Sequence, residues 1–201
     1  MTRILFLGAS IVSGFGLEPG EGLVDHIARL AQADGVRVEV HREAAPGAPA
    51  SGGEAQWRRH LSHHGPPDVV VVALGLGDVF YGRTVRQVEE ALTALVRRIH
   101  QDAPEARVFL IRQQLFQAAY LDADAPVAAW PLLFDRVARA EEATLLPFFL
   151  EGVAGVPSLN QRDGVHPNAA GALRVAQNVW RSINIRSAGE EVRLLGLQPD
   201  R

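Results

Sequence analysis

Residues Asp68–Leu74 have the sequence Asp-Val-Val-Val-Val-Ala-Leu, an apolar run without polar alternation. Such a run is typical of a central strand in a parallel sheet, where helices cover both faces. Four further apolar or β-branched runs predict strands at Arg3–Leu7, Val36–Val40, Arg107–Ile111 and Leu145–Phe149. Between and after them, apolar residues at three- and four-residue spacing predict helices at Gly22–Ala33, Glu54–His64, Thr84–Gln101, Pro126–Ala143 and Asn168–Ile183. This alternation predicts an α/β fold, a three-layer α/β/α sandwich around a five-stranded parallel sheet.

The composition excludes several classes of protein. A net charge of −3 argues against a dedicated nucleic-acid surface. The chain contains neither cysteine nor lysine, so disulfides, thiol nucleophiles, a P-loop lysine and Schiff bases are all excluded. No apolar run is long enough to cross a membrane.

The length of 201 residues fits one domain, predicted at residues 1–185, followed by a tail at residues 186–201. Met1–Leu7 is already strand-like and has no small-residue cleavage site, so a cytoplasmic location is expected. The sequence carries no indication of oligomeric state.

In open parallel sheets, ligands bind beyond the carboxyl ends of the strands, so the loops that follow the predicted strands are the candidate site. Gly8-Ala9-Ser10 follows the first strand. A serine there can present its hydroxyl beside backbone N–H groups, as acyl transfer requires. Taken alone, however, these residues are equally compatible with a simple tight turn.

Asp163-Gly164-Val165-His166 lies in the last loop before the final helix. The carboxylate of Asp163 can reach the imidazole of His166 through a tight turn and hold it in the tautomer that accepts a proton from a serine. A capped loop with a surface histidine is the alternative. Glycine-bearing loops also follow the second strand, at Ala45–Pro49, and the third, at Gly75–Asp78.

Together, these four loops resemble the sequence blocks of the GDSL/SGNH hydrolase family, in particular its bacterial acyl-CoA thioesterases, lysophospholipases and arylesterases. The resemblance implies a flavodoxin-like strand order, a small acyl ester or thioester as substrate, and no cofactor or metal. It further implies a triad in which Ser10 is the nucleophile, His166 the general base and Asp163 the residue that orients the imidazole. The oxyanion hole would use the backbone N–H groups of Ser10 and Gly47, with Gly77 at the third position.

Two positions depart from the family pattern. Ala9 replaces an aspartate beside the nucleophile, and Gly77 replaces an asparagine whose side chain donates to the oxyanion. Loss of one such donor typically lowers turnover by about 10²–10³-fold. The alternative function is therefore a catalytically weak or inactive domain that binds an acyl or glycan ligand.

Other features have ordinary interpretations. His60, His63 and His64 suggest a metal site, but no carboxylate completes the set locally, so we expect a solvated helix end and no metal. The glycines from Gly8 to Gly16 do not have the spacing of a dinucleotide-binding motif.

Trp57, Trp130 and Trp180 are expected in the core. Two loop segments correspond to regions that line the acyl pocket in the related enzymes: Phe80–Arg83 and Gln113–Tyr120. The alternative is that these segments only cover the surface of the domain.

Overall fold

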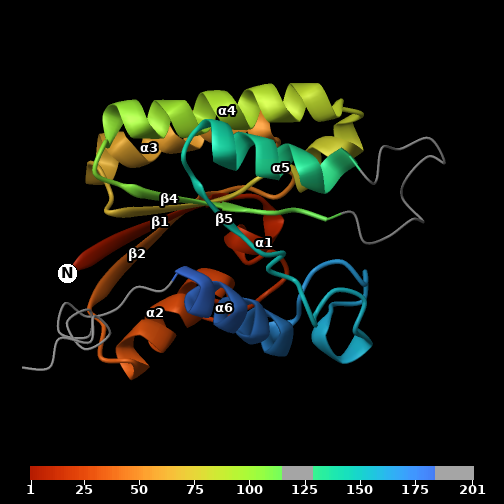
Figure 1. The fold of residues 1–201 in the computed structure, drawn as a ribbon. Helices are drawn as coiled ribbons and strands as arrows, with labels where there is room; N and C mark the ends of the chain where they lie inside the picture. The colour runs from red at the N-terminus through yellow and green to blue at the C-terminus, as the bar shows by residue number, and fades with distance from the viewer. Residues whose placement is uncertain (115–128, 184–201) are drawn as a thin grey trace, which may run out of the picture.

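A computed structural model describes residues 1–114 and 129–183 of the chain (Figure 1). Its centre is a five-stranded sheet in the order β2-β1-β3-β4-β5, and every neighbouring pair of strands is parallel. This is the predicted flavodoxin-like order. The strands are β1 (Thr2–Gly8), β2 (Val38–Ala44), β3 (Val69–Ala73), β4 (Arg107–Ile111) and β5 (Thr144–Leu146).

Helices cover both faces of the sheet, as the three-layer prediction requires. Helices α3, α4 and α5 lie on one face, and α2 and α6 lie on the other (Figure 1). The helices are α1 (Ser10–Ser13), α2 (Leu23–Ala33), α3 (Gly53–His64), α4 (Val85–Asp102), α5 (Ala129–Ala140) and α6 (Ala169–Ile183). Short 3₁₀ helices occur at η1 (Ala50–Gly52), η2 (Leu76–Tyr81) and η4 (Pro157–Leu159).

Strand β1 shows how the sheet divides the core. Ile4 and Phe6 pack toward α2 and α6, whereas Leu5 and Leu7 pack toward α3, α4 and α5, and all four are fully buried. Each such side chain contributes about 1.5–3 kcal/mol by leaving water. Because both faces are apolar, the strand cannot shift by one residue without exchanging one core for the other.

Two strands differ from their predicted bounds by more than one residue. β2 begins at Val38 rather than Val36, and it extends to Ala44 because the edge strand pairs with β1 over its whole length, although it then includes the polar residues His41, Arg42 and Glu43. β5 ends at Leu146 because Pro147 has no N–H to donate, while the following Phe148–Leu150 stays buried as a loop.

The predicted helices are all present where the structure describes them, but α5 ends at Ala140 and not at the predicted Ala143. Thr84 caps α4 by accepting a hydrogen bond from the N–H of Gln87, and Pro131 lies in the first turn of α5. All three tryptophans are buried. Within the described ranges, no helix is both long and apolar enough to cross a membrane. The predicted tail and the start of the helix predicted at Pro126 lie outside the described residues.

Candidate active site

Ser10 is the first residue of α1, directly after the carboxyl end of β1. A Cβ at Gly8 would stand 2.3 Å from the side chain of Val12, so the tight turn into α1 requires glycine at this position. The side-chain amide of Gln56, which is buried on α3, makes two hydrogen bonds with the backbone of Gly8. Its Nε2 donates to the Gly8 carbonyl at 2.9 Å, and its Oε1 accepts from the Gly8 N–H at 3.1 Å. Gln56 therefore fixes the serine loop in a chain where Ala9 carries no polar anchor.

Asp163 and His166 form a hydrogen-bonded pair. The Asp163 Oδ2 atom lies 2.7 Å from Nδ1 of the imidazole, and Oδ1 accepts from the N–H groups of Val165 and His166. The left-handed φ of +68° at Gly164 closes this turn. Burial of Asp163 acts to raise its pKa, but the hydrogen bonds from His166 and from the two N–H groups outweigh it, so the pKa is lowered. The carboxylate is therefore ionised at neutral pH.

Gln161 joins the serine loop to the histidine loop. Its Nε2 donates to the carbonyl of Phe15 at 2.8 Å and to that of Pro167 at 2.9 Å. The rings of Phe15 and His166 lie 4.8 Å apart. One side chain thus holds two segments that are about 150 residues apart in the sequence.

Gly47 lies in the loop after β2, and Gly77 lies in η2; these two segments pack tightly together. Gly47 has a left-handed φ of +73°, and a Cβ at Gly77 would stand 3.0 Å from the carbonyl oxygen of Ala48. Asp78, which is buried, accepts a 2.7 Å hydrogen bond from the N–H of Ala50 and so ties the two loops. Burial raises the pKa of Asp78, while the Ala50 N–H and the charge of Arg83 oppose that change. Because the backbone of Gly47 and Ala48 packs so closely against Gly77, a side chain at position 77 would be crowded.

A cavity of about 320 Å³ brings all the predicted site residues together. Ser10, Gly47, Gly77, Asp163 and His166 all line it. Within the described residues, no hydrogen bond joins the Ser10 hydroxyl to the imidazole; such bonds are often long without substrate and shorten in the complex. Most of the remaining wall is apolar, with contributions from Ile11, Val12, Phe15, Leu76, Phe80, Phe149 and Val165.

Gln113 is a polar wall residue whose chemistry the sequence did not indicate. It lies two residues after the end of β4, is 1% exposed and lines the cavity. Its Nε2 has no hydrogen-bond partner in the described part of the chain. An unsatisfied buried donor costs about 1–3 kcal/mol, which makes a ligand acceptor at this place favourable. Phe80 also lines the cavity, whereas most of Gln113–Tyr120 lies outside the described residues.

The prediction that all three histidines of α3 lie at a solvated helix end is wrong for His60. His63 and His64 are exposed, but His60 is 1% exposed and faces β2, where His41 lies beside it. The pattern missed this contact because His41 belongs to a different element. No metal ion could be inferred from α3 alone.

Comparisons with known proteins show the family of the chain. Residues 6–174 match the GDSL-like lipase/acylhydrolase family. Esterase TesA of Pseudomonas aeruginosa is 30% identical over 183 residues, covering 90% of this chain and 87% of TesA. An arylesterase of Vibrio mimicus is 23% identical, covering 90% of this chain and 88% of its own.

Solved structures show the same fold. A crystal structure of TesA superposes with a TM-score of 0.79 at 29% identity, covering 90% of this chain and 98% of that one. The psychrotrophic esterase EstA from Pseudoalteromonas sp., inhibited by monoethylphosphonate, superposes with a TM-score of 0.81 at 23% identity, covering 91% and 97%. The chain therefore belongs to the GDSL-like lipase/acylhydrolase family.

Proposed function

We propose that the protein hydrolyses small carboxylic esters or thioesters with Ser10 as the nucleophile. The observation that carries the proposal is the 2.7 Å contact between Asp163 and His166, in a cavity that Ser10 also lines. Because the carboxylate holds the proton on Nδ1, the Nε2 atom of the imidazole keeps a lone pair and acts as a base.

In the first half of the reaction, the Ser10 Oγ attacks the acyl carbon and its proton passes to Nε2 of His166. The tetrahedral intermediate expels the alcohol or thiol, which takes that proton, and an acyl-serine ester remains. In the second half, His166 takes a proton from the water that attacks the ester carbon. The second tetrahedral intermediate then expels the Ser10 Oγ, which takes this proton back from His166, and the acid is released. The negative charge of Asp163 stabilises the imidazolium that forms in both halves.

The developing oxyanion needs hydrogen-bond donors. The N–H of Ser10, as the first residue of α1, has no acceptor within its helix. Gly47, in the loop after β2, and Gly77, in η2, line the same cavity with their backbone. Backbone donors held by Gln56 and Asp78 would need little reorganisation during the reaction. The apolar wall favours an acyl group or aromatic leaving group over a charged substrate.

The decisive experiment is labelling with an organophosphonate, a class of reagent that captures an activated serine. We expect incubation with an aryl alkylphosphonate to add one phosphonyl group on Ser10, identified by peptide mass spectrometry. The His166→Ala variant should label far more slowly, because its serine has no base. The EstA structure inhibited by monoethylphosphonate provides a precedent for the reagent.

An adduct on another serine, or no adduct at any reagent concentration, would contradict the proposal. The latter result would favour the second candidate, a domain that binds an acyl or glycan ligand without turnover. The replacement of the oxyanion-binding asparagine by Gly77 is the feature that motivates this alternative.

We further propose that the Gln113 amide donates a hydrogen bond to the substrate and partly replaces the donor that Gly77 lacks. Replacement by methionine, of similar length, should lower kcat for a short-chain aryl ester by about 10–100-fold. Thermal stability should be unchanged or increased, because an unpartnered buried amide is removed. Steady-state kinetics and calorimetry measure both effects.

The control is Gln101→Met, an equivalent change at an exposed position of α4. It should leave both quantities unchanged. If Gln113→Met lowers the melting temperature and leaves kcat intact, Gln113 has a structural role and the donor assignment is wrong.

A further inference from the structure

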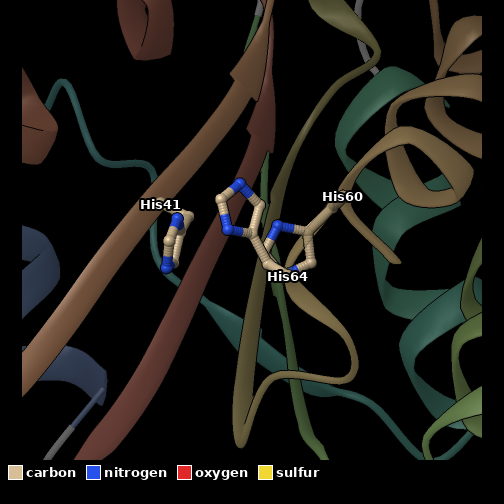
Figure 2. Close-up of side chains that lie close together, drawn as sticks. All are labelled: His41, His60 and His64. Carbon is tan, nitrogen blue, oxygen red and sulfur yellow. The ribbon is translucent and has the colours of Figure 1, made fainter. Parts of the chain in front are cut away.

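Three histidines from two elements meet between β2 and α3. His41 lies on β2, His60 lies inside α3 and His64 is the last residue of α3 (Figure 2). One ring nitrogen of each lies within 4.8 Å of those of the other two. The ring centroids of His41 and His64 are 4.2 Å apart, and that of His60 is 5.3 Å from His41 and 5.1 Å from His64.

Buried His60 has a free nitrogen in this cluster. Its Nδ1 atom is buried and has no hydrogen-bond partner within the described chain. A buried ring nitrogen without a partner can supply its lone pair to a metal ion.

From this geometry, we propose that His41, His60 and His64 bind a divalent transition-metal ion of the zinc class. Imidazole nitrogens are preferred ligands of zinc, copper and nickel, whereas calcium and magnesium prefer oxygen. Ligand nitrogens around tetrahedral zinc lie about 3.3 Å apart, given bonds near 2.0 Å. Small rotations of the exposed His64 and the half-buried His41 can close the remaining distance.

The surroundings of the cluster favour a cation. Glu39 Oε1 lies 3.0 Å from Nε2 of His41, which leaves Nδ1 for the ion and resembles the carboxylate–histidine support of known metal sites. Arg3, whose charge acts on His60, lies 3.9 Å from the carboxylate of Asp68, which balances that charge. With His64 at the surface, the fourth position can be occupied by water.

An ion at this cluster would cross-link β2 to α3. These elements flank the loop that carries Gly47, since β2 ends at Ala44 and α3 begins at Gly53. α3 also provides Gln56, which holds the serine loop. Metal binding would therefore stabilise the support of the active site without contributing a ligand to the reaction.

The test is a titration of the full chain with zinc, monitored by isothermal titration calorimetry. The protein carries no affinity tag and is first treated with a chelator to remove bound metal. We expect one zinc ion per chain, and an increase in melting temperature of about 5–10 °C at a hundredfold excess over the Kd. His64→Ala, at an exposed position that the fold does not need, should weaken binding by at least about 100-fold. His41→Gln should do the same, with an unchanged circular dichroism spectrum.

Two controls locate the ion. His63→Ala removes the exposed neighbour of His64 and should retain full zinc affinity, as should His166→Ala at the catalytic cavity. Absence of zinc binding by the wild type would overturn the proposal. So would equal affinity of the wild type and His64→Ala, or a loss in His63→Ala or His166→Ala as large as that in His64→Ala.

Discussion

Replacement of Ser10 by alanine is expected to lower turnover of a short-chain aryl ester by about 10⁴-fold or more, and His166→Ala should lower it by a similar factor. The two losses should not add in the double variant, because nucleophile and base act as one unit. The Ser10 side chain contacts the cavity and makes no hydrogen bond within the described residues, so the fold should survive its loss. Steady-state kinetics and thermal unfolding measure the two effects.

Matched controls are available on the surface. Ser51 is exposed on η1 and His63 is exposed on α3, so Ser51→Ala and His63→Ala should retain wild-type rates. Retention of most activity by Ser10→Ala or His166→Ala would show that another residue attacks the substrate or accepts its proton.

The parts of the fold that local patterns determine were predictable. Central strands such as β3 are apolar on both faces and need no knowledge of their neighbours. Helix α4 has a capping threonine and one apolar stripe, so its bounds were predicted to within one residue. The polar end of β2 was missed because it is a strand only through its pairing with β1.

The candidate site likewise contains contacts that local sequence patterns predict and contacts that they do not. Asp163 and His166 are close in sequence, and a short turn brings them together, so their contact could be inferred. Gln56 and Gln161 support the loops through contacts with residues 48 and 146 positions away, for which the sequence contains no local signal. The histidine cluster was missed for the same reason, since His41 joins it from another element.

Asp163→Asn is expected to lower kcat by about 10³–10⁴-fold while preserving the fold. The asparagine can still accept from the N–H groups of Val165 and His166, so the turn persists. Its amide, however, can donate to Nδ1 of His166, which moves the ring proton to Nε2 and removes the base. Asp163→Ala provides no such donor, so its imidazole is not forced into the wrong tautomer. ¹⁵N chemical shifts of the imidazole report the tautomer in each variant.

The same substitution has a pH signature. Hydrogen bonds in the folded protein lower the pKa of Asp163 below its ordinary value of 3.8, despite the opposing effect of burial. The carboxylate therefore stabilises the fold at pH values above 3.8, and this contribution is lost as the pH falls through the lower folded value. The difference in unfolding free energy between wild type and Asp163→Asn should accordingly shrink in acid. A difference that stays constant with pH, together with a rate within tenfold of wild type, would mean that the Asp163 charge neither supports the loop nor orients His166.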